Sequence, residues 1–110
     1  MRTITAQTEI DALFKGGRRF SSKFVTLIVS RTPPSRGPEG RVMFVAGRRL
    51  GGAVWRNRSK RVLRAAVSRS GGPWRGFDVA LVAQKGTAEA PAYGLDAALE
   101  QALQRSGVAE

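Results

Sequence analysis

The chain has 110 residues, 42% of them hydrophobic, and its 19 basic and 8 acidic side chains give a formal net charge of +11. This length predicts a single domain over residues 1–110 with a modest hydrophobic core. Because the chain has no cysteine and no histidine, a disulfide framework, a thiolate site and the commonest general base are excluded. The charge predicts a polyanionic partner, with nucleic acid favoured over an acidic membrane surface.

The N-terminal segment has no continuous apolar run, so we expect neither a signal peptide nor a membrane span, and a cytoplasmic location. The stretch TEIDALFKGG predicts a short helix, because Ile10, Leu13 and Phe14 have the i, i+3, i+4 spacing of one apolar face. Gly16 and Gly17 predict where this helix ends.

Three segments predict β-strands. KFVTLIVS (residues 23–30) is rich in β-branched residues, and RVMFVAG (residues 41–47) has strand length as well. The loop between them, residues 31–40, holds three prolines and two glycines, so we expect it to be flexible and the two strands to pair across it as a hairpin. FDVALVAQ (residues 77–84) is almost wholly apolar, which predicts a central strand.

Two longer helices complete the chain. One is predicted over residues 53–68; the other, in LDAALEQALQRSG, places Leu95, Ala98, Leu99, Ala102 and Leu103 on one face. Gly107 follows its end, and we expect residues 107–110 to form a frayed tail. The order α-β-β-α-β-α, with room for one extra short strand, predicts an α+β fold, a single-domain α-β sandwich with helices packed on a small sheet.

The helix predicted at 53–68 has two contrasting faces. Its apolar side carries Trp55, Ser59, Val62, Leu63 and Ala66, at i, i+4, i+7, i+8 and i+11. The opposite side carries a basic stripe of Arg56, Lys60 and Arg64, with Asn57 and Arg61 beside it and Arg58 at the far edge. We therefore expect one face to pack on the sheet and the other to form a cationic ridge.

The surrounding charge pattern strengthens this interpretation. No acidic residue occurs between Glu39 and Asp78, and that span holds ten basic ones. Like charges at i, i+4 repel, and arginines near a helix N-terminus oppose its dipole, so a partner with negative charge would stabilise the arrangement. Guanidinium groups match phosphate oxygens, and an asparagine amide can both donate to and accept from a base edge or a ribose 2′-hydroxyl.

The segment GRRLGGAVWRNRSKRVLRAA resembles the signature of the bacterial ribonuclease P protein component family. That signature is a basic pair, then Gly-x-Ala-Val, then Arg-Asn-Arg-x-Lys-Arg, then a further arginine. The match runs through Arg48-Arg49, Gly51, Ala53-Val54, Arg56-Asn57-Arg58, Lys60-Arg61 and Arg64. The N-terminal helix ending in FKGG, the strand RVMFVAG and the segment FDVALVAQKG also agree, so the resemblance covers about residues 3–106.

The resemblance implies the protein subunit of a ribonucleoprotein endonuclease that removes the 5′ leader from precursor tRNA. It implies that the RNA subunit is the catalyst, that Mg²⁺ is held by this RNA and the substrate, and that the protein alone is inactive. It also implies a left-handed β-α-β crossover, contrary to the usual right-handed rule. The partners it implies are the catalytic RNA and the precursor-tRNA leader, with no membrane and no small-molecule substrate.

Two sets of site residues are expected from the charge pattern and the resemblance together, and neither gives a catalytic or metal-binding residue in the protein. The RNA-binding set is Arg48, Arg49, Arg56, Asn57, Arg58, Lys60, Arg61 and Arg64; the leader-binding cleft is Phe14, Phe44, Arg48 and Lys85. The chain departs from the family pattern at Gly47 and Gly52, where side chains are common, and at Ser59, where a larger apolar residue is common.

Other functions are weighed against this one. A ribosomal or general RNA-binding protein explains the charge equally well but not the ordered Arg-Asn-Arg segment. A helix-turn-helix DNA-binding protein is disfavoured because a strand and a glycine turn precede the basic helix. GRRLGG lacks the spacing and the Lys-Ser/Thr pair of a phosphate-binding loop, so we reject a nucleotide-binding P-loop.

Overall fold

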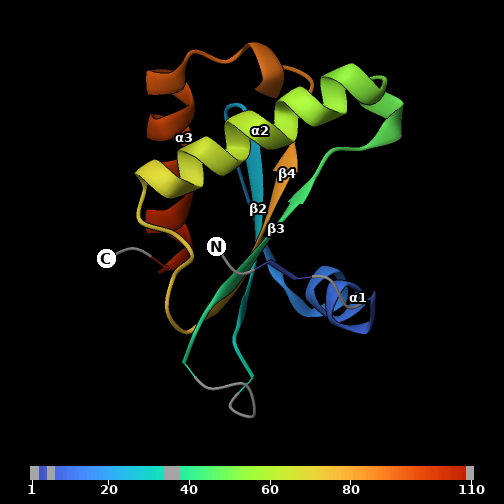
Figure 1. Ribbon diagram of the computed structural model, residues 1–110. Coiled ribbons are helices and arrows are strands. Elements are labelled where there is room, and N and C mark those ends of the chain that lie inside the picture. The colour runs from blue at the N-terminus through green and yellow to red at the C-terminus, as the bar shows by residue number, and fades with distance from the viewer. Residues whose placement is uncertain (1–2, 5–6, 34–37, 109–110) are drawn as a thin grey trace.

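The computed structural model describes residues 3–4, 7–33 and 38–108. Within them, helices pack on both faces of a four-stranded sheet (Figure 1). The helices are α1 (Gln7–Gly16), α2 (Ala53–Arg69) and α3 (Ala92–Ser106), and the strands are β1 (Arg18–Ser22), β2 (Val25–Arg31), β3 (Arg41–Val45) and β4 (Phe77–Ala83). The α+β class, the three helices and the extra short strand, β1, are confirmed.

The strand order in the sheet is β1-β2-β4-β3. β1 and β2 form the hairpin, through a turn at Lys23 and Phe24 in which Phe24 has a φ of 74°. β4 pairs antiparallel with β2 and parallel with β3, so its predicted central place is confirmed. The predicted hairpin between residues 23–30 and 41–47 is wrong, because β4 lies between these two strands.

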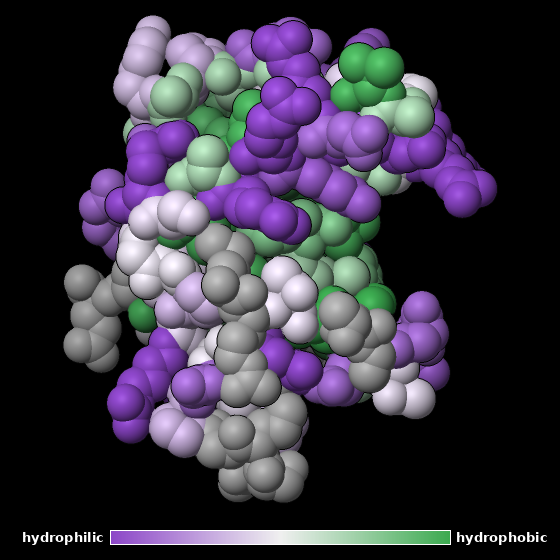
Figure 2. Space-filling view, viewed as in Figure 1, coloured by the Kyte–Doolittle hydropathy of each residue, from purple (hydrophilic) through white to green (hydrophobic). Residues whose placement is uncertain are grey.

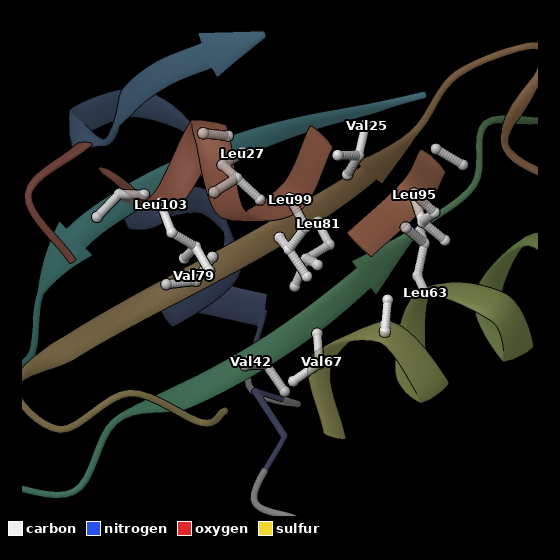
Figure 3. Packing of buried hydrophobic residues seen from close by; sticks show 14 residues of the cluster. Val25, Leu27, Val42, Leu63, Val67, Val79, Leu81, Leu95, Leu99 and Leu103 are labelled. Atoms are coloured by element: carbon white, nitrogen blue, oxygen red, sulfur yellow. The ribbon is translucent and has the colours of Figure 1, made fainter. Parts of the chain in front are cut away.

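Strand alternation divides the sheet residues between two cores. On one face, Val25, Leu27 and Leu81 pack with α2 and α3, and Figure 3 shows these side chains gathered between strands and helices. On the other face, Ile28 and Ala80 pack with α1. Among the described helices, only α1 lies on this face, together with Ile4 of the N-terminal segment, and Thr26, Val45 and Val82 of the sheet are only half-buried.

Helix α2 follows the predicted periodicity. Ser59, Leu63, Ala66 and Val67 are buried, and Trp55 and Val62 pack half-buried against the same core. The helix ends at Ser70, before a turn that contains a cis peptide bond between Gly72 and Pro73. Trp74 in this turn is half-buried and packs against the core.

The ends of the predicted loop and tail are held by hydrogen bonds. The Thr32 amide donates to the Gly76 carbonyl, and the Gly76 amide donates to the Pro38 carbonyl. At the C-terminus Gly107 adopts φ 81°, and the Val108 amide donates to the Leu103 carbonyl, which closes α3 by a Schellman-type cap. The expected flexibility of 34–37 and fraying of 109–110 lie outside the described residues.

The β3-α2-β4 segment is a crossover between neighbouring parallel strands, in agreement with the resemblance. Its left-handed course stays a prediction. No helix in the described part of the chain is both long enough and apolar enough to cross a lipid bilayer.

Candidate nucleic-acid interface

The predicted cationic ridge is carried by α2, and we define it as the α2 ridge. Its members are Arg56, Asn57, Arg58, Lys60, Arg61 and Arg64. Five of the six are exposed and Arg56 is half-buried, because the helix turns its small and apolar residues toward the sheet. Figure 2 shows hydrophilic side chains crowded over this helix. The sequence therefore predicted the orientation of α2 correctly.

One flank of the α2 ridge faces the edge strand β3. The guanidinium carbon of Arg64 lies 5.2 Å from the centroid of the Phe44 ring. Lys60 and Arg64 line a hollow of about 190 Å³ together with Met43 and Phe44 of β3 and the N-terminal residue Ile4. This flank therefore combines two cations with an aromatic ring, which suits an unpaired nucleotide.

The other flank faces η3, a short 3-10 helix at Thr87–Glu89. The Nε of Arg58 donates to the Ala88 carbonyl oxygen at 3.1 Å, which fixes the direction of this side chain. On the N-terminal side, Nη1 of Arg56 reaches the Gly51 carbonyl oxygen at 3.5 Å. These hydrogen bonds from the guanidinium groups hold the two arginines in place, whereas Asn57 and Arg61 are exposed.

Within the described part of the chain, no carboxylate forms an ion pair with a member of the α2 ridge. Among the described residues, the ion pairs are Arg41 with Glu9 and a bidentate pair between Arg69 and Asp96, both away from the ridge. The hydrogen bond from Arg69 to Asp96 raises the pKa of that arginine. The phosphate-binding capacity of the ridge is therefore available to a partner.

The segment before α2 extends the basic surface. Arg48 and Arg49 are exposed in η2, a 3-10 helix at Arg48–Leu50. Next to them, Leu50 and Val54 are 44% and 83% exposed, which makes them two of the exposed large apolar side chains of the described chain. Apolar side chains among arginines suit contact with the face of a base or a ribose.

Three half-buried residues form a row across the α1 face of the sheet, and we call this row the open strip. They are Thr26, Val82 and Val45, one from each of three neighbouring strands. Gln84 is fixed over this row, because its amide donates to Thr26 Oγ1 at 3.1 Å and to the Ser22 carbonyl at 2.8 Å. Figure 2 shows apolar surface between the hydrophilic side chains of α2 and those of α1.

The structure brings some of the predicted cleft residues together and separates others. Phe14 is half-buried and packs against the same small core as Val82 of the open strip, on the α1 face of the sheet. Phe44 instead points to the α2 side of β3, beneath Arg64. The two rings therefore lie on opposite faces of the sheet, and Phe44 borders the α2 ridge through its contact with Arg64.

Arg48 and Lys85 lie at one edge of the sheet. β3 and β4 are parallel, and each of these exposed residues follows the C-terminal end of its strand.

The open-strip residues Thr26, Val45 and Val82 were missed by sequence reasoning. Strand alternation marks them as facing away from Val25 and Leu81, but only the register shows that they form one row.

The departures from the family pattern have local physical consequences. A Cβ at Gly47 or Gly52 would meet no atom within 4 Å, and neither residue has a positive φ. Side chains therefore fit at both positions. Ser59 is fully buried, and its hydroxyl has no hydrogen-bond partner among the described residues.

The carboxylates of the described residues do not gather into a metal site, since no three acidic side chains lie within reach of one ion. Glu9 pairs with Arg41, Asp96 pairs with Arg69, and Asp78 accepts a hydrogen bond from Thr32 at 3.3 Å. These donor sets do not fit a protein-held Mg²⁺, which prefers several carboxylate or water oxygens in octahedral geometry.

Together, the fold and the site define a small α+β domain with a basic helix beside an open sheet face. Residues 1–107 match the family model described as Ribonuclease P, and the chain belongs to this family. A ribonuclease P protein component from Roseiflexus sp. is 40% identical over 85 residues, 74% of this chain and 69% of that protein. One from Symbiobacterium thermophilum is 29% identical over 109 residues, 96% of this chain and 90% of that protein.

Other curated relatives match over shorter segments. The alignments with ribonuclease P protein components from Chloroflexus aggregans (51% identity) and Dehalococcoides mccartyi (38%) span 46% and 53% of this chain. They cover 36% and 48% of those proteins, so the chain spans less than half the length of each of these two relatives.

Solved structures agree in fold. The RNase P protein from Staphylococcus aureus superposes with a TM-score of 0.81 at 18% identity, covering 98% of this chain and 97% of that one. The RNase P protein from Thermotoga maritima gives 0.78 at 21% identity, covering 96% of this chain and 97% of that one.

Proposed function

We propose that this chain is the protein subunit of ribonuclease P, an endonuclease that removes the 5′ leader from precursor tRNA in the cytoplasm. In this proposal the RNA subunit is the catalyst and the protein alone is inactive. The observation that carries the proposal is the α2 ridge, a row of basic and amide side chains with no carboxylate partner among the described residues.

The α2 ridge binds the catalytic RNA. Its cations neutralise phosphates, and the exposed amide of Asn57 makes a directional contact with a base edge or a 2′-hydroxyl. Arg48 and Arg49 continue this contact beyond the helix N-terminus. Because Arg56 and Arg58 are held by backbone carbonyls, they present their remaining N–H groups with less loss of side-chain freedom.

The open strip holds the single-stranded leader. Phe14 and Val82 supply an apolar surface on which bases pack, and Lys85 at the edge of the sheet supplies a charge for the leader backbone. Leader binding raises substrate affinity without any chemistry by the protein. Mg²⁺ is bound by phosphates of the RNA subunit and substrate, and the nearby cations screen the repulsion between those strands.

The first test is RNA affinity as a function of salt. If about five phosphates are neutralised, the plot of log K against log salt should have a slope of roughly −3.5 to −4.5. The Lys60→Gln, Arg61→Gln double variant should flatten the slope by about 1.4 to 1.8, because it removes two phosphate contacts. The control Lys15→Gln, Arg75→Gln removes the same charge from exposed sites off the ridge. An equal effect of both variants would contradict a localised ridge.

The second test is reconstitution with ribonuclease P RNA at low magnesium. We expect cleavage of precursor tRNA at the mature 5′ end to be stimulated by the chain, and the chain alone to be inactive. Binding of the RNA without stimulation would instead support a ribosomal or general RNA-binding protein.

A further inference from the structure

A second basic hollow lies on the face of the sheet that packs against α3, at the edge opposite to Arg48 and Lys85. Its volume is about 420 Å³, within the range of small-ligand pockets (roughly 300–1,000 Å³). Phe77 begins β4 and Arg31 ends β2, and these two residues face each other in the strand register. Neither the open strip nor the α2 ridge contributes to this hollow.

Two arginine–phenylalanine pairs shape the hollow. The guanidinium carbon of Arg18 lies 5.1 Å from the centroid of Phe20, and that of Arg31 lies 5.8 Å from the centroid of Phe77. Both rings are half-buried, whereas both arginines are exposed. Strand alternation puts all four side chains on one face, with Val29 between them. The rings hold the guanidinium groups in place by cation–π contact.

The described residues that line the hollow carry only positive charge, from Arg18 and Arg31. The nearby acidic side chains line other hollows: Asp96 and Glu100 beside Arg69, and Glu9 and Asp78 in a hollow that Arg31 also borders. Neither Arg18 nor Arg31 forms an ion pair with another described residue. Two guanidinium groups over an apolar floor can bind a phosphate and leave room for a planar ring to stack.

We propose that this hollow binds a nucleoside phosphate, with Arg18 and Arg31 on the phosphate and the base over Val29 and the edges of the two rings. The ligand is either a free nucleotide or one unit of a single-stranded RNA. This site is separate from the surfaces that carry the ribonuclease P function, so its failure in the test below leaves that function standing.

The test is an NMR titration of the full chain with adenosine 5′-monophosphate, followed at the amides of Gly16, Val29 and Gly107, which border the hollow. We expect saturable shifts there, and affinity for inorganic phosphate about tenfold weaker because the stacked base is missing. Shifts confined to α2, or adenosine binding as well as the nucleotide, would overturn the proposal. If a short RNA without terminal phosphates binds more tightly than adenosine 5′-monophosphate, the ligand is a unit of single-stranded RNA. If it binds more weakly, the ligand is a free nucleotide.

Matched variants complete the test. The Arg18→Gln, Arg31→Gln chain should lose at least about tenfold in nucleotide affinity, because both charge-assisted contacts are removed. The Lys15→Gln, Arg19→Gln chain loses the same charge, but Arg19 lies on the opposite face of β1, so its affinity should change less than about twofold. An equal loss in both would show non-specific attraction. If the first variant does not fold, each single substitution and the titration of the unmodified chain decide the question.

Discussion

At the scale of single residues, Ser59 is the clearest unfavourable feature. Its hydroxyl is fully buried without a hydrogen-bond partner among the described residues, although the helix around it is regular. Replacing it by alanine removes the desolvated group and leaves only a small gap. We expect Ser59→Ala to raise the free energy of unfolding by about 1 kcal/mol, measured by urea denaturation.

Ser106 provides the matched control for this prediction. It is also a buried helical serine, but its Oγ donates to the Leu103 carbonyl oxygen at 2.8 Å. Ser106→Ala should therefore leave stability unchanged or lower it by up to about 1 kcal/mol. If both variants shift stability in the same direction by the same amount, the unpaired hydroxyl is not the cause.

Gly52 offers a second residue-scale prediction. It is the N-cap of α2, with φ −79° and ψ −172°, and it provides no side-chain acceptor for the first-turn amides. A side chain fits there without contact, whereas a Cβ on neighbouring Gly51 would lie 2.8 Å from the Trp55 ring. Gly52→Asn should raise the unfolding free energy by about 0.5 kcal/mol, and Gly51→Asn should lower it. Thermal denaturation of the two variants measures the difference.

At the scale of elements, the sequence predicted the helices and the segments of β2, β3 and β4, allowed for β1 without placing it, and did not give the sheet order. The faces of α2 could be read from its spacing because a helix fixes which residues share a side. Strand alternation likewise separates Phe44 from Met43, but it does not say which strand lies next to β3. The loop 31–40 suggested a hairpin, yet a central β4 gives two apolar strands a neighbour on each side.

The missing strand order is also why the sequence could not show on which face of the sheet each predicted cleft residue lies. Without the register, Phe14 and Phe44 looked equally able to contact one leader. In the structure α1 lies on one face and α2 on the other, so two aromatic residues that both belong to the apolar pattern meet different partners. Phe44 is paired with Arg64 only because a crossover helix covers that face of β3.

The strand order can be tested by cross-linking, since the natural chain has no cysteine. Thr26 and Val82 are direct partners across β2 and β4, so a Thr26→Cys, Val82→Cys chain should form an intramolecular disulfide on oxidation. The control pair Thr26→Cys, Val45→Cys should not, because β4 separates the two strands. A hairpin of residues 23–30 with 41–47 would give the opposite result in a mass measurement of the oxidised chains.

At the scale of the whole molecule, the distribution of charge opposes folding and favours binding. The net charge of +11 is carried on a chain with a radius of gyration of 13.0 Å, so many cations lie within a few Debye lengths of one another. The α2 ridge adds like-charge neighbours at i, i+4 without an acidic residue in its first turn. An RNA partner relieves this repulsion, which makes binding and stability depend on the same side chains.

Salt should therefore act in opposite directions on the free chain and on the complex. Added potassium chloride screens the repulsion and should raise the melting temperature of the free chain, while it weakens RNA binding by the counterion effect. Arg61→Glu separates the two effects, because it places a carboxylate at i−3 to Arg64 and i+3 to Arg58 on the exposed crest. At low salt we expect it to stabilise the free chain by up to about 1 kcal/mol and to weaken RNA binding more than Arg61→Gln does. Melting curves and RNA titrations of the unmodified chain, Arg61→Glu and Arg61→Gln at low and high salt measure the stability and the RNA affinity. If the melting temperature of the free chain falls as salt is added, repulsion does not limit its stability.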